Sequence, residues 1–208
     1  MTNPDNPVPL IGVCGGTGAG KSTLVEQIQR RVNSPGLLVL HQDRYYLNLD
    51  HLPKADRDWR NFDAPDSYER PLLLKHLSQL KKGETIEVPV YDFRTHTRTG
   101  YERVGPARAV VVEGILLFAD EELRDCFDLR VFVDAPDDVR LLRRIERDQR
   151  ERGRTFDSVR FQYLDTVRPG HERYIAPTKA HAHLIVNGTR DFGPVVDLLA
   201  RWIEAELK

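Results

Sequence analysis

The chain has 208 residues, with 31 Lys and Arg against 32 Asp and Glu and a formal net charge of −1. This length suits one domain that carries, at most, an inserted lobe. Because the charges nearly cancel, the composition argues against attachment to nucleic acid or to an anionic membrane through a general basic field, and it favours a small substrate.

Short apolar runs alternate with helical patterns along the chain. The runs predict strands at 8–14, 37–40, 109–112, 129–133 and 183–186. The spacing of apolar residues between them predicts helices over 21–32, 72–82 and 191–207. This alternation is typical of an α/β fold with a mainly parallel, five-stranded sheet between two layers of helices.

Two segments interrupt the alternation. Residues 48–71 are polar and rich in Asp and contain three prolines, which predicts a long connection that carries site residues. Residues 85–91 alternate apolar and polar side chains, and residues 97–104 are predicted to pair back on them as a hairpin. We therefore expect a single domain over 1–208, with a small β-hairpin substrate lobe inserted at about 84–104.

The cysteines and the N-terminal residues bear on the compartment. Cys14 and Cys126 are too few for a disulfide framework or a thiolate zinc site, which favours a reducing compartment. Residues 1–7 lack the charged and apolar regions of a signal peptide, and no apolar stretch is long enough to span a bilayer. We expect a cytoplasmic protein with no membrane partner.

The most informative motif follows the first predicted strand and opens the first predicted helix. Its residues fit the pattern Gly, four residues, Gly-Lys-Ser/Thr, and the segment reads Gly15, Gly16, Thr17, Gly18, Ala19, Gly20, Lys21, Ser22 and then Thr23. Glycines let successive backbone N–H groups point at one anion, which then sits at a positive helix N-terminus. Lys21 is expected to reach the β- and γ-phosphates, and Ser22 to ligate Mg²⁺. A glycine-rich turn that carries a lysine by chance is the alternative to a nucleoside triphosphate site.

Two acidic residues follow predicted strands at the edge where ligands of such folds bind. Glu113 ends the valine run of the third strand and is expected to orient Mg²⁺ or its waters. Asp43 stands just beyond the second strand, where it can accept a proton from a substrate hydroxyl. The alternatives are a strand-end acid for Glu113 and a turn-capping acid for Asp43.

Seven arginines crowd residues 140–154, beginning in a predicted helix with Val139, Leu142 and Ile145 on its apolar face. This predicts an arginine-rich lid at about 140–160, whose guanidinium groups neutralise charge on a transferred phosphoryl group. Gly153 is a natural hinge or helix stop in it. The acidic neighbours offset part of the charge, so a solvated face laced with salt bridges is the alternative.

Other classes of nucleotide-binding protein fit less well. The guanine-reading segment Asn-Lys-x-Asp and the switch segment Asp-x-x-Gly of GTP switches are both missing from the sequence. A motor or remodelling enzyme is usually larger. Phosphoryl transfer to a small acceptor remains.

Several motifs together resemble one family, the uridine-cytidine kinases, a group of P-loop kinases, from about residue 10 to 191. Besides the glycine-rich loop, the resemblance rests on segments 42–46 (QDRYY), 61–66 (NFDAPD), 89–98 (PVYDFRTHTR), 113–116 (EGIL), 150–154 (RERGR) and 177–179 (PTK). It implies phosphorylation of uridine or cytidine at the 5′-hydroxyl by ATP or GTP, with Mg²⁺. It also implies a homo-oligomer, a tetramer in this family, and no nucleic-acid partner.

The resemblance assigns roles to individual residues. It implies that Asp43 is the base for the 5′-hydroxyl, that Asp63 accepts both ribose hydroxyls, and that Tyr91 and His96 contact the pyrimidine. One carboxylate has two oxygens for two neighbouring donors, so deoxyribonucleosides are expected to be poor acceptors. A neutral imidazole can donate to the uracil oxygen or accept from the cytosine amine, depending on its tautomer.

The remaining implied roles concern the lid and the donor. Arg147 and Arg152 are implied as lid contacts to phosphate, and they form the catalytic group with Lys21 and Asp43. The implied acceptor-side contacts are Arg144, Arg154 and Gln162. Asp191 is implied near the adenine. Arg44 and His183 depart from the family pattern. Arg44 is expected to lower the pKa of Asp43 or touch a phosphate, and His183 to change only a strand edge.

Two other functions stay open at this point. One is a P-loop kinase for a different small hydroxyl acceptor, of the phosphoribulose, pantothenate or nicotinamide riboside type. The other is a nucleotide-gated binding protein without turnover.

Overall fold

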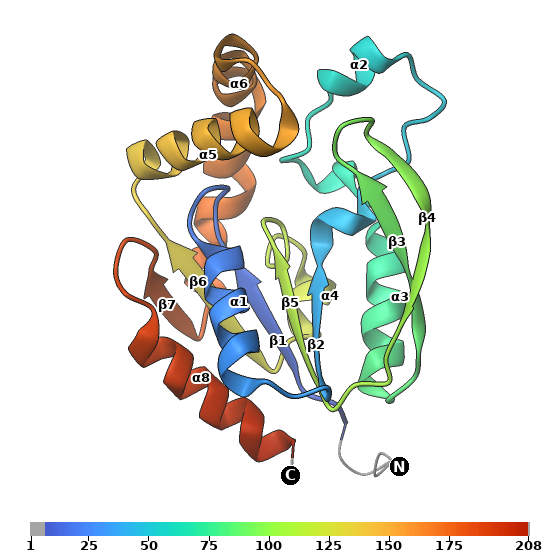
Figure 1. Ribbon diagram of the computed structural model, residues 1–208, viewed down its shortest axis with the longest axis vertical. Helices are drawn as coiled ribbons and strands as arrows, with labels where there is room; N and C mark the ends of the chain where they lie inside the picture. The colour runs from blue at the N-terminus through green and yellow to red at the C-terminus, as the bar shows by residue number, and fades with distance from the viewer. Residues whose placement is uncertain (1–6, 208) are drawn as a thin grey trace.

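The computed structural model describes residues 7–207 and is built on a five-stranded parallel sheet (Figure 1). The strand order is β2-β5-β1-β6-β7, and every neighbouring pair is parallel. The strands are β1 (Leu10–Cys14), β2 (Leu37–His41), β5 (Ala109–Gly114), β6 (Leu129–Asp134) and β7 (Leu184–Asn187). The expected sheet is confirmed, with strand ends shifted by one or two residues from the predicted ones.

The register of the central strands places three residues in one row across the sheet. Val13 of β1 lies opposite Glu113 of β5, which lies opposite His41 of β2. Because all strands run the same way, the loops that follow Cys14, His41 and Gly114 emerge at the same edge of the sheet. That edge carries the candidate site.

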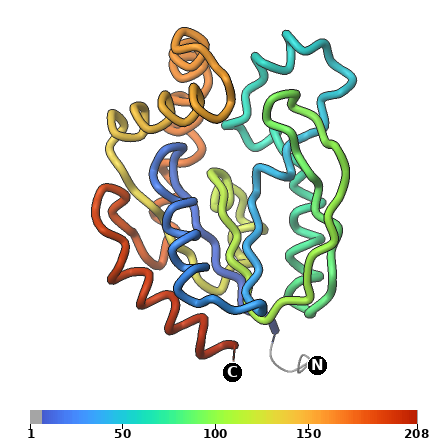
Figure 2. Tube along the Cα trace, in the orientation of Figure 1, coloured from blue at the N-terminus to red at the C-terminus, as the bar shows by residue number. Residues whose placement is uncertain are grey.

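Helices cover both faces of the sheet, so the molecule has three layers (Figure 2). The helices α1 (Lys21–Val32) and α8 (Gly193–Glu206) share one apolar core with the sheet, to which Leu24 and Ile203 contribute. On the other face, α3 (Arg70–Lys81) and α4 (Glu121–Asp125) share a second core, which includes Leu77. A sheet buried on both faces needs strands that are apolar along their whole length, which explains the uninterrupted apolar runs of the sequence.

The remaining segments gather above the carboxyl edge of the sheet. They are α2 (Lys54–Asp58), α5 (Asp137–Arg152), α6 (Phe156–Gln162) and the short 3₁₀ turns Gln42–Tyr45 and Pro65–Ser67. From α6 the chain returns toward β7 through further helical segments, the π-helical Tyr163–Val167, α7 (Arg168–Gly170), the π-helical His171–Ile175 and the 3₁₀ segment Ala176–His181. The predicted long connection at 48–71 contains one short helix and one 3₁₀ turn, and its last two residues begin α3.

The expected hairpin is confirmed as a separate two-stranded sheet. Its strands β3 (Ile86–Asp92) and β4 (Thr97–Val104) pair antiparallel, with Ile86 opposite Val104 and an irregularity between Val90 and Tyr91. The hairpin packs beside α3 and reaches up toward the same edge as the glycine-rich loop (Figure 1).

The predicted apolar face of the arginine-rich helix is wrong. Leu142 is 67% exposed, whereas Arg140, Arg144 and Asp148 are the buried residues of α5. The physical reason is that α5 lies over the loops at the sheet edge instead of on the apolar sheet, so its inward side meets polar groups. The expected helix stop is confirmed, since Gly153 ends α5 with φ 64°.

Two expectations concern membrane-spanning segments and the ends of the chain. Among residues 7–207, none of the helices has the length and apolar character that crossing a bilayer requires. Residues 1–6, on which the absence of a signal peptide was judged, lie outside the described residues, as does residue 208 of the expected 1–208 domain.

Gly188 offers a test of how tightly the glycine-rich loop packs against the end of β7. A Cβ at Gly188 would lie 2.0 Å from the carbonyl oxygen of Ala19, so Gly188→Ala must displace this backbone. We expect the free energy of unfolding in urea to fall by about 1–3 kcal/mol, as for other overpacked sites. Gly100→Ala, at a hairpin position with no atom within 4 Å of an added Cβ, is the matched control. Equal stability of the two variants would contradict this packing argument.

Candidate active site

The loop between β1 and α1 is held in its curled form by two close backbone approaches. Gly15 and Gly18 have φ of 146° and 76°, and a Cβ at either would lie 2.3 Å from a carbonyl oxygen, of Val133 and of Arg140 respectively. Only glycine fits both positions. The loop therefore presents its backbone to the space at the start of α1, as an anion site requires.

Two polar side chains of α1 follow this loop. The buried Lys21 donates from Nζ to the carbonyl oxygen of Gly16 at 3.0 Å, so its ammonium group lies against the loop. Burial lowers the pKa of Lys21, while the nearby Glu113 acts to raise it. Ser22 donates from Oγ to Glu113 Oε1 at 3.1 Å, which joins the helix start to the end of β5.

Glu113 also contacts the neighbouring strand. Its Oε2 lies 3.1 Å from His41 Nδ1, and this contact is the main cause of a raised pKa for His41. Burial acts to raise the pKa of Glu113, but the contacts with His41 and Lys21 outweigh it and the pKa is lowered. The residue is therefore an anionic oxygen donor at neutral pH.

The pair Ser22 and Glu113 fits a magnesium site. Hydroxyl and carboxylate oxygens are ligands that Mg²⁺ prefers, and the ion usually takes its other ligands from phosphates and water. Within the described part of the chain, no group of three or more His, Cys, Asp or Glu residues could hold a metal by itself. A magnesium ion here would therefore be held jointly with a bound nucleotide.

A cavity of about 580 Å³ joins these groups to the segments above the sheet edge. Its floor is made by the glycine-rich loop and Glu113, and its roof by arginines of α5 and the turn after it. Further lining residues come from the end of β2 and the connection after it, from the hairpin and from α6, and they include His41, Gln42, Asp43, Tyr46, Phe62, Asp63, Phe93, His96 and Gln162.

Asp43 lies in the 3₁₀ turn that directly follows β2. The turn is anchored by Gln42, whose Oε1 accepts a hydrogen bond from the backbone N–H of Leu116 at 3.0 Å. Burial raises the pKa of Asp43, and the negative charge of Glu113 adds to the effect. A carboxylate with a raised pKa is a stronger proton acceptor, which suits a general base.

Asp63 is buried in the connection between α2 and the 3₁₀ turn Pro65–Ser67. Its backbone packs on Gly170, where a Cβ would lie 2.8 Å from the Asp63 carbonyl oxygen. Burial raises the pKa of Asp63, although the guanidinium of Arg144 opposes this shift. Hydrogen-bond donors from a ligand would therefore stabilise this buried carboxylate.

Aromatic rings form one end of the cavity. Phe62 stacks on His96, with ring centroids 4.7 Å apart, and Tyr46 meets Phe62 edge to face at 5.0 Å. His96 lies at the hairpin turn with φ 55°, and its backbone N–H donates to the carbonyl oxygen of Asp92. Burial lowers the pKa of His96 to about 4, so the imidazole is neutral at pH 7.

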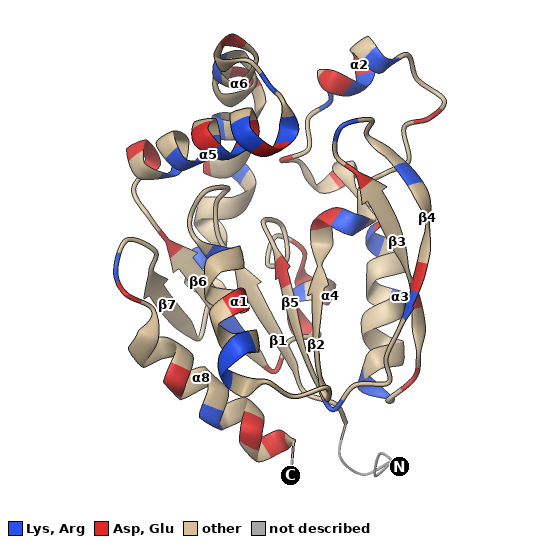
Figure 3. Cartoon of the chain, viewed as in Figure 1, with Lys and Arg blue, Asp and Glu red and all other residues tan. Residues whose placement is uncertain are grey.

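The arginines of the lid are tied to the loop below them and to α6. Arg144 and Arg147 both donate to Thr17 Oγ1, at 3.3 and 3.4 Å. Gln162 Oε1 accepts from Arg144 at 2.7 Å and also from Arg154. Figure 3 shows the charged segments of α5 and α6 above the strand ends, so this roof brings positive charge to the site where an anion would bind.

Comparisons with known proteins agree with this geometry. A model of the phosphoribulokinase/uridine kinase family matches residues 10–192. A uridine kinase of Lactobacillus johnsonii is 42% identical over 200 residues, which cover 95% of each chain, and a uridine kinase of Clostridium novyi is 45% identical over 180 residues, 85% of this chain and 86% of that one. The chain belongs to this family.

The fold of a solved member extends the comparison. The phosphoribulokinase from Rhodobacter spheroides superposes with a TM-score of 0.67 at 17% identity, over 88% of this chain and 70% of that one. At this identity the likeness concerns the fold alone, and it agrees with the P-loop kinase fold expected from the sequence.

Most of the residues that the resemblance singled out lie around the one cavity. Of the glycine-rich segment, Gly15, Gly16 and Ala19 are buried behind the surface that lines it. Tyr91 lies behind the lining rings, in contact with Tyr46 and Phe93. Asp191 lies outside the lining and accepts a hydrogen bond from the N–H of Gly193 at the start of α8. The roles of these residues in this member of the phosphoribulokinase/uridine kinase family stay predictions.

The expectation for Arg44 is wrong. Its guanidinium turns away from the cavity, donating to the carbonyl oxygen of Pro89 at 2.9 Å and to Glu102 at 2.8 Å. Arg44 therefore connects the turn of Asp43 to the hairpin. His183 contacts Arg130 beside the edge strand β7, where a local effect was expected.

Sequence reasoning missed several cavity residues and one buried carboxylate. His41, Tyr46, Phe62 and Phe93 line the cavity, and Asp148 lies inside the arginine cluster. Three of the lining residues lie within the motifs that carry the resemblance, Phe62 beside Asp63, Tyr46 at the end of segment 42–46 and Phe93 inside segment 89–98, which is a signal that could have been used. Asp148 gave no such signal, because an acid among arginines on a helix is usually a surface ion pair.

The lowered pKa of His96 gives a testable pH dependence. Its pKa is about 4 in the folded protein against an ordinary 6.5, so the folded state disfavours its protonation. The stability that neutral His96 allows is present above pH 6.5 and is lost as the pH falls toward 4, at a slope of at most about 1.4 kcal/mol per pH unit for one proton.

We expect His96→Gln to flatten the fall in unfolding free energy between pH 7 and pH 5, measured by urea titration. His51→Gln, at a side chain that is 66% exposed, is the control and should keep the slope of the parent protein. A slope that His96→Gln leaves unchanged would show that this imidazole is not buried in its neutral form.

Proposed function

We propose that the protein is a nucleoside kinase that transfers the terminal phosphoryl group of ATP to the 5′-hydroxyl of uridine or cytidine. The observation that carries the proposal is one cavity with a phosphate-binding loop and Ser22–Glu113 on one wall and Asp43, Asp63 and His96 on the other. Relatives named uridine kinase, 42% identical over 95% of the chain, support the choice of acceptor.

On the donor side, the loop amides and Lys21 would bind the phosphates, and Ser22 with Glu113 would hold Mg²⁺. When bound, the magnesium ion neutralises charge on the phosphates. The arginines of the lid, Arg147 and Arg152 above all, would stabilise the charge that spreads over the transferred group. They would act inside the cavity, where such charges interact more strongly than in bulk water.

On the acceptor side, Asp63 would accept hydrogen bonds from the two ribose hydroxyls, and Arg144, Arg154 and Gln162 would line the same pocket. The pyrimidine would pack between the aromatic rings, with neutral His96 facing its 4-position and Tyr91 behind. This leaves the 5′-hydroxyl toward Asp43, which would take its proton as the oxygen attacks in line. Much of the rate would come from this alignment.

The resemblance to the uridine-cytidine kinases supports three further proposals. They are a homotetrameric state, a cytoplasmic location, and ATP or GTP as the donor. Sedimentation velocity and a comparison of kcat/KM for the two donors test the first and the last.

A coupled ADP-release assay against a panel of acceptors tests the proposed function. We expect turnover with uridine and cytidine, and much less with phosphoribulose, pantothenate or nicotinamide riboside. Turnover with one of those three alone would support a kinase for another acceptor. Nucleotide binding without turnover on any acceptor would support a binding protein and overturn the proposal.

Asp43→Asn tests the base directly. The amide cannot take a proton, so we expect kcat to fall by about 10²–10⁴-fold. Affinity for the donor, measured by titration calorimetry, should stay within about threefold. Asp50→Asn, at an exposed acid of the same connection, is the control and should keep full turnover. Near-normal turnover of Asp43→Asn would remove Asp43 from this role.

Asp63 makes a prediction about the sugar. A 2′-deoxynucleoside leaves one oxygen of a buried carboxylate without its donor, which costs about 1–3 kcal/mol. We expect kcat/KM for 2′-deoxyuridine to be about 10–100-fold below that for uridine, and Asp63→Asn to narrow this ratio because it weakens binding of the ribonucleoside. An unchanged ratio in the variant would place sugar recognition elsewhere.

A further inference from the structure

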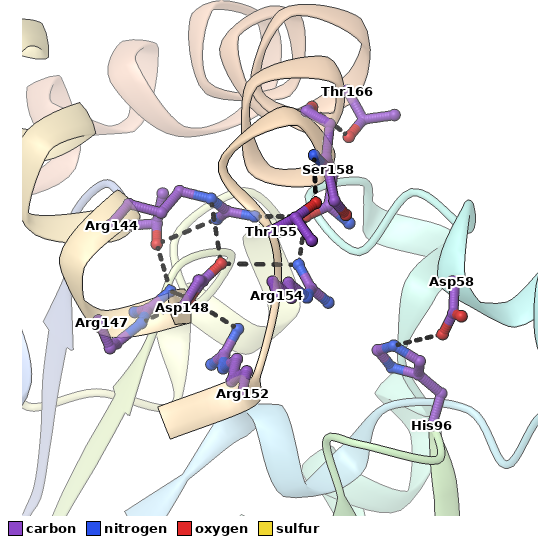
Figure 4. A network of polar contacts seen from close by, with 12 residues as sticks. Asp58, His96, Arg144, Arg147, Asp148, Arg152, Arg154, Thr155, Ser158 and Thr166 are labelled. Carbon is purple, nitrogen blue, oxygen red and sulfur yellow. Dashed lines mark hydrogen bonds and ion pairs between the residues drawn. The ribbon is translucent and has the colours of Figure 1, made fainter. Parts of the chain in front are cut away.

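A single carboxylate lies at the centre of the lid arginines. Asp148, midway along the second half of α5, is fully buried, with an exposed fraction of 0%. Four guanidinium groups surround it within 3.6 Å (Figure 4), and they belong to Arg144, Arg147, Arg152 and Arg154.

The two oxygens of this carboxylate have different partners. Oδ1 accepts two hydrogen bonds from Arg147, from Nε at 2.9 Å and from the terminal nitrogen at 2.8 Å, and lies 3.5 Å from Arg152. Oδ2 lies 3.6 Å from Arg144 and from Arg154 and accepts no hydrogen bond. Arg147 is therefore the side chain that Asp148 orients most firmly.

The backbone of Asp148 fixes the same cluster from a second direction. Its carbonyl oxygen accepts hydrogen bonds from the N–H groups of Gly153 and Arg154, which close the end of α5. Gly153 takes the left-handed conformation that this reversal needs. The turn brings Arg154 back over the carboxylate that Arg144 and Arg147 contact from the helix.

Asp148 is set back from the cavity that the surrounding arginines line. All four arginines line the cavity, whereas Asp148 does not. Burial acts to raise the pKa of Asp148, but the guanidinium groups outweigh it and the pKa is lowered, so the group is an anion at neutral pH. One negative charge faces four positive ones, so the cluster stays cationic toward the cavity.

Removal of this anion would leave four like charges close together, with neutral partners such as Thr17 and Gln162 in place of a counter-charge. Their mutual repulsion would spread them, and each long side chain would regain rotamer freedom. The charge available to a bound triphosphate would persist, while the orientation toward the transferred group would be lost. The two effects are separable in kinetics.

We propose that Asp148 is a positioning residue for phosphoryl transfer, which acts through Arg147 by holding the lid arginines aimed into the cavity before the substrates bind. This inference rests on the proposed function. Because Asp148 does not line the cavity, its removal would act on the reaction only through the arginines.

Asp148→Asn keeps the size of the side chain and removes its charge. We expect kcat, normalised to donor-binding sites counted by titration, to fall about 10–100-fold, while KM for the donor stays within about threefold. Asp157→Asn, at an acid of α6 that is 74% exposed and pairs with Arg160, is the matched control and should leave both constants unchanged. A variant whose melting temperature falls but whose normalised kcat is unchanged would overturn the proposal, because the carboxylate would then serve stability alone.

A double-variant cycle tests the route through Arg147. If Asp148 acts by orienting Arg147, then Arg147→Gln with Asp148→Asn should have a kcat within about threefold of Arg147→Gln alone. Losses that multiply would overturn the proposed route. The double variant removes one charge of each sign, so it can still be measured if Asp148→Asn alone does not fold. If neither the single nor the double variant folds, the proposal is overturned in favour of a role in folding.

The parent protein separates this inference from the proposed function. Its turnover of uridine and cytidine decides the acceptor, and the cycle is measured with whichever acceptor supports turnover. An altered acceptor would therefore count against the proposed function and leave the result for Asp148 standing. A parent protein without turnover on any acceptor would overturn both.

Discussion

The register of the parallel strands is the constraint on which the site depends. Val13, Glu113 and His41 lie in one row across β1, β5 and β2. Parallel strands end at the same edge, so the phosphate-binding loop, the acid that contacts Ser22 and the turn of Asp43 are delivered there together. A shift of one residue in the register would turn each side chain to the other face of the sheet and disperse these groups.

The site brings several ionisable side chains together in a place where burial disfavours their charged forms. Lys21, Asp43, Asp63, Glu113 and the lid arginines share one cavity, and burial shifts the pKa of several of them toward the neutral form. Pairing offsets this cost for Glu113, through His41 and Ser22, and for Asp148, through four arginines. Asp43 and Asp63 have no such close partner, and they are the two carboxylates proposed to meet the substrate.

The lid and the hairpin approach the cavity from opposite sides and contact each other. The guanidinium carbon of Arg152 lies 5.1 Å from the ring centroid of Phe93, and the hairpin is held to the turn of Asp43 by Arg98, which donates to the carbonyl oxygens of Tyr45 and Tyr46. The lid on the donor side and the hairpin on the acceptor side are therefore in direct contact. This link suits a reaction in which two substrates must be aligned before one group moves.

The sequence by itself determined the sheet, the helix that opens the phosphate loop, the hairpin, and the identity of most proposed site residues, because strand and helix periods and the glycine-rich pattern are local properties of the chain. Family resemblance, and not spacing, singled out Asp63 and His96. Only the tertiary structure decided which side of α5 faces inward, that Arg44 serves the hairpin, and that Asp148 is buried among arginines. The reason is that a helix placed over loops instead of an apolar sheet buries whichever polar side chains find partners there, and those partners come from segments far away in the sequence.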